Sequence, residues 1–304
     1  MSVFEQAKKF IYRNARPLDL ARWKFHFENG STGEVLNALS VYQNDDGGFA
    51  YAIEPDSWNT NSTPIGVWAA ARILYSINFA DTNHPIIEGM LKYLDSGKDF
   101  ADGKWFNTVA SNNSFPHAIW WECGSDTGIP DDNPTVSLAG FALRFSDKDS
   151  KLNRKASDIA VKSVNEFIDR PTDEFHTLRC FADLLGYCEE IEGFDLFDLN
   201  KFRKTLVSKV NEIICKEPEK WYTDYVCKPS VFFENSNSIF QLTDRELAEK
   251  ESEMIISQQL PDGSFPITWQ WHTNYKEFEI SANWWKSDLI IKNMLYLREF
   301  GKID

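Results

Sequence analysis

Two carboxylates in the segment 54–56 are the first residues of this sequence that could do chemistry. Glu54 and Asp56 flank Pro55, just before the segment 62–79, which we expect to be a buried helix. Such a pair can act as general acid and general base, or hold a cation, when the surroundings separate the two pKa values. A solvated loop next to a helix N-terminus would also favour these charges. We take Glu54 and Asp56 as candidate catalytic residues.

Two further segments carry candidate catalytic residues. Asp131 and Asp132 precede Asn133 and Pro134, a typical helix start in which Asn133 would be the N-cap. The two carboxylates could stabilise that helix end or face a cavity. His272 lies in the aromatic run "TWQWHTNY", where we expect a cavity rim. Asp131, Asp132 and His272 therefore join the candidate catalytic set.

Aromatic residues are unusually frequent, with 11 Trp and 23 Phe in 304 residues. Much of this content must form the core, but Trp also stacks on rings and cations. The segment 98–132 is long for a loop, and long ordered loops are usually functional. Its run "HAIWWE" could form a lid with a sugar-stacking platform, or a plug. The candidate substrate-binding residues are His117, Trp120, Trp121, Trp271, Trp284 and Trp285.

A short motif recurs along the chain. "QNDDGGF" at 43–49 and "QLPDGSF" at 259–265 share the pattern Q-x-x-x-G-x-F, and "DFADGKW" at 99–105 is a looser copy with Asp99 in the Gln position. The Gly supplies a positive φ after a helix, and the Gln can bond to helix-terminal groups. Catalytic residues are rarely repeated in every structural unit of a fold, whereas a structural connection between units must be. We therefore interpret the motif as a structural joint.

The segments before the two full motif copies are predicted to be one-faced helices. Residues 31–43 begin with the capping box Ser31-x-x-Glu34, and residues 243–259 begin with a similar box at Thr243. Both segments continue with apolar residues on one face only. They are therefore expected to lie on the outside of the fold.

The segments that follow the motif copies are predicted to be a different kind of helix. Residues 62–79 and 133–145 are apolar in nearly every direction, which is typical of a helix buried on most sides. We expect about a dozen helices in all and no strands. Alternating outer and inner helices predict an all-α fold, an α/α toroid of about five or six helical hairpins, as one domain over 1–304; a helical solenoid is the alternative.

These features resemble a known group of proteins. The Q-x3-G-x-[FW] loops resemble the QW motifs of the terpenoid cyclase and protein prenyltransferase toroids, and the copies lie near both ends of the chain. The stretches "DGGFAYAIEPD", "NPTVSLAG" and "PDGSFPITW" look similar to those of bacterial prenyltransferase or squalene-cyclase repeat proteins. The resemblance implies a toroid with a central ligand cavity, although a fold does not fix a function.

The active-site motifs of these families are incomplete in this chain. Cyclases of this kind protonate an alkene with a D-x-D-D motif, but "GIPDDNPT" has Ile129 in the first Asp position. Protein prenyltransferases of similar fold hold zinc with an Asp, a Cys two residues later and a distant His. Asp224 and Cys227 are one residue too far apart for that pattern, with His272 downstream. We expect neither mechanism and no metal site, and the sequence indicates no particular cofactor.

Composition excludes several partners. The net charge is −14 without a basic cluster, which disfavours nucleic acid. No apolar run approaches the ~18 residues of a membrane span, and the N-terminus lacks the apolar region of a secretory signal. Five Cys without a CxxC pair indicate reduced thiols. We expect a cytoplasmic protein whose ligand is a small molecule or an oligosaccharide in the central cavity.

Two classes of function remain open. The first is an enzyme with an aromatic, acidic central cavity, either cyclase-like or transferase-like as the resemblance implies, or a carbohydrate-active hydrolase or lyase with a carboxylate pair. The second is a non-catalytic module that binds a glycan, peptide or lipid. Convergence of Glu54, Asp56, Asp131 and His272 on one pocket would favour the enzyme.

Overall fold

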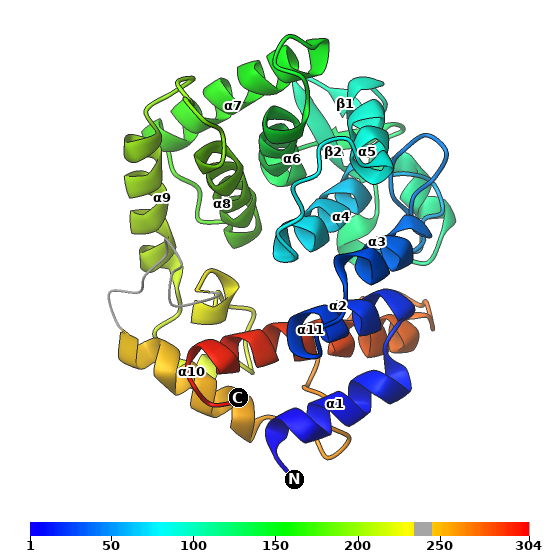
Figure 1. Ribbon diagram of the computed structural model, residues 1–304, viewed down its shortest axis with the longest axis vertical. Coiled ribbons are helices and arrows are strands. Elements are labelled where there is room, and N and C mark those ends of the chain that lie inside the picture. Colours follow the sequence, from blue (N-terminus) through cyan, green and yellow to red (C-terminus); the bar gives the residue numbers. More distant parts are fainter. Residues whose placement is uncertain (234–244, 304) are drawn as a thin grey trace. The chain divides into compact units, whose positions relative to one another are not determined.

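The computed structural model describes residues 1–233 and 245–303, and helices dominate this part of the chain (Figure 1). The prediction of a mostly helical protein is confirmed. Thr243, the expected start of the helix at 243–259, lies outside the described residues. The α-helices are α1 (Val3–Asn14), α2 (Pro17–Phe27), α3 (Thr32–Ser40), α4 (Pro64–Ser76), α5 (Pro85–Asp95), α6 (Asp132–Phe145), α7 (Lys151–Asp169), α8 (Phe175–Glu189), α9 (Leu199–Ile213), α10 (Arg245–Ser257) and α11 (Phe278–Glu299).

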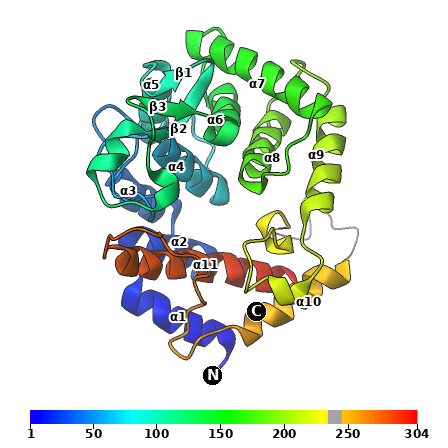
Figure 2. The same cartoon turned by 180° about the vertical axis from the view of Figure 1, so that it is seen from behind.

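The prediction that the chain has no strands is wrong. Strands β1 (Phe100–Ala101), β2 (Lys104–Val109) and β3 (Gly128–Pro130) form a small antiparallel sheet in the order β1-β2-β3, seen beside α6 in Figure 2. Asp102 and Gly103 connect β1 to β2 with φ values of 54° and 79°, as a tight hairpin turn requires. The third motif copy is therefore a hairpin and not a joint between helices.

The chain divides into two compact units, which we describe separately. Unit 1 comprises residues 1–38, 210–270 and 276–304, and unit 2 comprises residues 39–209 and 271–275. Unit 1 thus combines the first and last segments of the chain, whereas unit 2 is nearly continuous. Among the helices of the described residues, none combines the length and the apolarity needed to cross a bilayer.

In unit 2 the first motif copy connects the loop at 43–49 to the start of α5. Gln43 follows α3, and its Nε2 donates to the carbonyl oxygens of Gly47 at 3.0 Å and of Ile86, in the first turn of α5, at 3.1 Å. Asp46 Oδ1 accepts from Gly48 N at 3.0 Å and thereby fixes the turn. In unit 1 the predicted capping box at the start of α3 is confirmed by mutual hydrogen bonds between Ser31 and Glu34.

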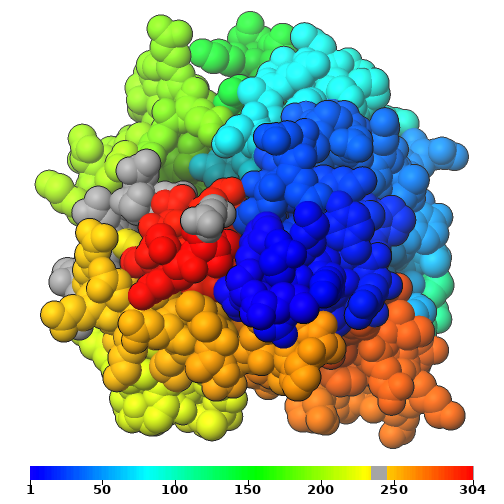
Figure 3. Space-filling view, turned by 60° about the horizontal axis from the view of Figure 1, so that its bottom comes forward, coloured from blue at the N-terminus to red at the C-terminus, as the bar shows by residue number. Residues whose placement is uncertain are grey.

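In unit 1 the second motif copy builds the same joint. Gln259 Nε2 donates to Gly263 O at 3.1 Å and to Val3 O, at the start of α1, at 2.8 Å. Asp262 Oδ1 accepts from Ser264 N at 2.9 Å. Figure 3 shows the N-terminal segment, in dark blue, directly against the orange segment that carries this motif. The geometry of both copies agrees with the interpretation of the motif as a structural joint.

A buried cluster of charges connects α2 to α11 in unit 1. Arg22 Nη1 lies 3.2 Å from Asp19 Oδ1 and 2.9 Å from Asp288 Oδ1. Arg16 Nε approaches Asp19 at 2.7 Å, and Lys292 Nζ approaches Asp288 at 2.7 Å. Because buried charges are tolerated only when they are paired, this cluster fixes how the two helices pack.

Candidate functional site

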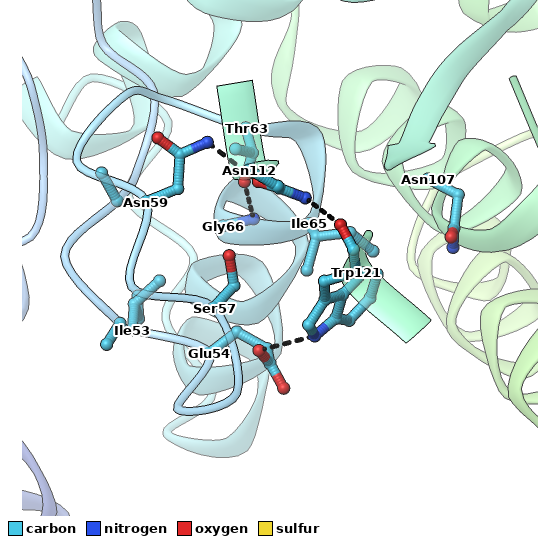
Figure 4. A pocket seen from close by; sticks show the side chains of 12 residues that line it. Ile53, Glu54, Ser57, Asn59, Thr63, Ile65, Gly66, Asn107, Asn112 and Trp121 are labelled. Carbon is cyan, nitrogen blue, oxygen red and sulfur yellow. Dashed lines mark hydrogen bonds between the residues drawn. The ribbon is translucent and has the colours of Figure 1, made fainter. Parts of the chain in front are cut away.

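A small polar pocket lies in unit 2, between the loop that precedes α4 and the loop that precedes α6 (Figure 4). It encloses about 320 Å³ between atoms when its open mouth is included, and its closed part has room for about one water molecule. Ala50, Ile53 and Ile65 give it an apolar floor. Its polar lining consists of Glu54, Ser57, Asn59, Asn107, Asn112 and Trp121.

Glu54 is the one predicted catalytic residue that lines this pocket. Its Oε2 accepts from the backbone N–H of Asp56 at 3.0 Å and from Trp121 Nε1 at 3.1 Å. Figure 4 shows the indole edge of Trp121 turned toward the carboxylate. Glu54 therefore holds the predicted Trp121 in place while it faces the pocket.

A chain of buried amides forms the opposite side of the pocket. Asn59 Nδ2 donates to Asn112 Oδ1 at 2.8 Å and to Ser111 Oγ at 2.8 Å. Asn112 Nδ2 in turn donates to the carbonyl oxygen of Trp121 at 3.0 Å. Asn59 and Asn112 are almost fully buried. The lining is therefore held in one arrangement before any ligand arrives.

Asp56, predicted to act with Glu54, has its carboxyl group elsewhere. Asp56 Oδ1 accepts from Trp271 Nε1 at 2.6 Å, and both residues are buried. The carbonyl oxygen of Asp56 accepts from Ala118 N at 2.9 Å, and Trp271 O accepts from Ile119 N at 3.0 Å. Asp56 and Trp271 thus tie together three segments that are far apart in the sequence.

The two predicted histidines both lie outside the lining of the pocket. His117 is buried, and its Nδ1 lies 2.6 Å from Phe115 O; since a carbonyl only accepts, Nδ1 carries the proton. Its ring lies 5.5 Å from that of Tyr275. His272 is exposed and has a φ of 55°. Neither histidine lines the pocket.

Asp131 and Asp132 serve the start of α6. Asp131 Oδ1 accepts from Asn133 N at 2.9 Å, and Asp132 pairs with Lys104 at 3.1 Å. Partial burial of the carboxyl group raises the pKa of Asp131, although the residue as a whole is exposed. The predicted N-cap, Asn133, instead uses its Oδ1 to accept from Cys180 Sγ at 3.4 Å. Neither carboxylate lines the pocket.

The remaining predicted tryptophans differ in their surroundings. Trp120, beside Trp121 in a short 3-10 helix, is 40% exposed. Trp284 and Trp285 belong to α11 in unit 1. The Arg16 guanidinium lies 5.4 Å from the ring of Trp284, and Trp269 meets Trp285 edge-on at 5.5 Å.

The structure therefore brings part of the predicted site together. Glu54 and Trp121 line the pocket, while Asp56, His117 and Trp271 form buried support around the same loops. Sequence reasoning missed the amide and hydroxyl groups of the lining. The available signals were the polar runs "SWNTNS" and "SNNS" within two long loops.

Neither a search for metal-ligand clusters nor a comparison with known proteins assigns a function to the pocket. Among residues 1–233 and 245–303, no three His, Cys, Asp or Glu side chains are placed to hold a metal ion. Comparison of the chain with protein-family models, curated proteins and solved structures gives no match. The class defined by the structure is a mostly helical protein with one small antiparallel sheet.

The contact between Asp56 and Trp271 can be tested by mutation. Asp56→Ala is expected to cost about 2–3 kcal/mol in the free energy of unfolding, because it removes an acceptor from a buried indole N–H. Asp56→Asn keeps an oxygen and is expected to cost less. Urea unfolding measures both, with exposed Asp45→Ala as the control. An Asp56→Ala variant as stable as the control would contradict this anchoring role.

Proposed function

We propose that the chain is an α/α-toroid protein of the terpenoid cyclase and prenyltransferase kind. The two matching joints support this proposal. One ties the loop at 43–49 to α5 within unit 2, and the other ties the loop at 259–265 to α1 within unit 1 through the hydrogen bond from Gln259 to Val3. In an open solenoid each repeat contacts only its neighbours, so the last repeats do not join the first. The pairing of the last outer helix with the first therefore favours a closed ring.

We further propose that unit 2 binds a hydroxyl-rich ligand of the carbohydrate class. The observation that carries this proposal is the polar pocket itself, in which a carboxylate, a hydroxyl group and three amide side chains gather around Trp121. Sugar hydroxyls both donate and accept, and so they match this mixture. The exposed ring of the neighbouring Trp120 offers a stacking surface outside the pocket.

The size and polarity of the pocket limit what enters it. Its closed part has room for about one water, so a single hydroxyl group would enter while the rest of the sugar stays at the mouth. The amides of Asn59 and Asn112 and the carboxylate of Glu54 already have partners within the protein, so a ligand hydroxyl would add to or compete with these hydrogen bonds.

The geometry favours binding over hydrolysis. Glycoside hydrolysis commonly uses two carboxyl groups on either side of the scissile bond. Within the described residues Glu54 is the one carboxylate in the lining, and Asp56 Oδ1 is hydrogen-bonded to Trp271 instead. We therefore favour a non-catalytic glycan-binding protein over the enzyme, and Glu54 accepts a hydrogen bond from a ligand hydroxyl.

Ligand titration tests this proposal. Mono- and oligosaccharides, and separately an isoprenoid diphosphate, are titrated while tryptophan fluorescence is recorded. We expect saturable binding of at least one sugar, weakened about tenfold by Glu54→Gln, because a hydrogen bond to a charged group contributes about 1.5–3 kcal/mol. Glu88→Gln, on the exposed face of α5, is the matched control. Binding of the diphosphate without any sugar, or wild-type affinity in Glu54→Gln, would refute the proposal.

A further inference from the structure

A second pocket lies in unit 2, away from the residues of the polar pocket. It is formed by the C-terminal ends of three helices that lie side by side in Figures 1 and 2: α4, α6 and α8. It encloses about 390 Å³ between atoms, open mouth included, and has room for several water molecules. Half of its ten lining residues are aromatic, namely Tyr75, Phe79, Phe141, Phe145 and Tyr187; the others are Ala71, Leu74, Asn78, Ala80 and the carboxylate Glu190.

Four of these rings form a connected cluster. Tyr187 lies edge-on to Tyr75, with ring centroids 5.5 Å apart, and also edge-on to Phe141 at 6.1 Å and Phe145 at 6.3 Å. Phe141 and Phe145 lie 4.8 Å apart. Phe141, Phe145 and Tyr187 are buried, whereas Tyr75 is 41% exposed at the mouth. Tyr75 is therefore the ring of this cluster that a ligand can reach, and the three buried rings hold it in place.

The electrostatics of this pocket favour a cation. The last residues of α4, α6 and α8 all belong to it or adjoin it, so three helix C-termini, with their partial negative charge, lie around the same space. The carboxylate of Glu190 is part of the lining. Aromatic faces add negative potential, because the quadrupole of each ring is negative above its plane.

We infer that this pocket binds an organic cation with N-methyl groups, a quaternary ammonium. Such a cation is weakly hydrated and apolar on its surface, so it can leave water for an aromatic wall and keep its charge near Glu190. Hard metal ions are usually held by more than one carboxylate, and Glu190 is the one carboxylate among the described residues of this lining. A neutral apolar group would fill the space but gain nothing from the carboxylate or the helix ends.

Arg144 already interacts with two of the groups that would bind the cation. Its Nε lies 3.0 Å from Glu190 Oε2, and its guanidinium lies 5.2 Å from the ring of Phe145. The arginine therefore competes with a bound cation for the same carboxylate and ring. This contact gives the inference an unusual consequence: removing Arg144 should strengthen binding, whereas removing the charge of Glu190 should weaken it.

The test compares choline with 3,3-dimethylbutan-1-ol, which has the same shape without the charge, by two-dimensional NMR titration of the full chain. Choline is expected to bind at least fivefold more tightly than the alcohol. Glu190→Gln and Tyr75→Leu are each expected to weaken choline binding several-fold, and Arg144→Gln to tighten it. All variants change side chains at the mouth of the pocket, and their thermal unfolding is measured alongside.

Glu88→Gln, on the exposed face of α5, serves as the control and should leave choline binding unchanged. The inference is overturned if the alcohol binds as tightly as choline, if Glu190→Gln binds choline as the parent does, or if choline does not bind. Sugar binding is scored separately, so failure of the carbohydrate proposal would not be mistaken for failure of this one.

Discussion

A Gly47→Ala variant is expected to lose about 3 kcal/mol or more of its free energy of unfolding, from positive-φ strain together with a steric clash. Gly47 has a φ of 90°, a conformation that L side chains rarely adopt. A Cβ atom there would lie 2.0 Å from the carbonyl oxygen of Gly89, which belongs to the backbone of α5. A helix backbone cannot move aside as a flexible side chain can, so the contact between the loop at 43–49 and α5 must open.

The second joint offers a repeat of this experiment in unit 1. Gly263 has a φ of 93°, and a Cβ there would lie 2.2 Å from Gln6 O in α1. Gly263→Ala should therefore be as damaging as Gly47→Ala. The controls are Gly97→Ala and Gly193→Ala, which also have positive φ but no atom within 4 Å of the added Cβ, and should cost about 1 kcal/mol. Urea unfolding that ranks Gly47→Ala with these controls would contradict the joint.

The joints could be predicted because their essential chemistry is local. The Gln, the Asp and the Gly of each copy interact with one another within a few residues, so the spacing in the sequence preserves the geometry. The helices that receive the second bond of each Gln could not be predicted. Gln259 bonds to Val3, 256 residues away, and no local pattern encodes such a contact.

The false third copy has an equally physical explanation. Asp-Gly allows positive φ at two successive positions, which serves a tight hairpin as well as the end of a helix. The choice at Asp102 and Gly103 is made by β3, which pairs with β2 from about 25 residues further along the chain. The Asp-Gly motif is compatible with both structures, and which one forms depends on strand pairing with residues outside the motif.

In the candidate site, too, some residues could be predicted from the sequence and others could not. Glu54 could be predicted because its carboxylate stands outside the repeated motif, in a segment that occurs once. The position of Asp56 could not, because its partner Trp271 lies 215 residues away and converts a candidate acid into a buried anchor. Asn59 and Asn112 gave no distinctive signal, since Asn in a loop is commonly a turn residue. Only the folded chain turns these amides toward one pocket.

The buried charges of unit 1 carry the second large prediction. Arg22→Met is expected to cost about 3–5 kcal/mol in the free energy of unfolding, because Asp19 and Asp288 keep their charges in the interior without the guanidinium between them. The matched control is Arg245→Met, which removes the exposed ion pair with Glu249 and should cost less than about 1 kcal/mol. Equal losses in the free energy of unfolding would contradict the claim that burial makes the ion pairs of Arg22 more important than the exposed pair of Arg245.

The pH dependence of stability distinguishes a loss of charge interactions in this cluster from a loss of packing. Burial by itself would raise the pKa of Asp288, but Lys292 and Arg22 outweigh it and hold the pKa well below the usual value. A carboxyl group with a lowered pKa stabilises the fold above its unfolded pKa of about 3.9, and that contribution is lost as the pH falls further. Asp288→Asn lacks the titrating group, so its deficit against the parent chain should be largest near pH 7 and shrink below about pH 4. A deficit independent of pH, measured by urea unfolding at pH 7, 5 and 3, would show that the lost interaction is packing and not charge.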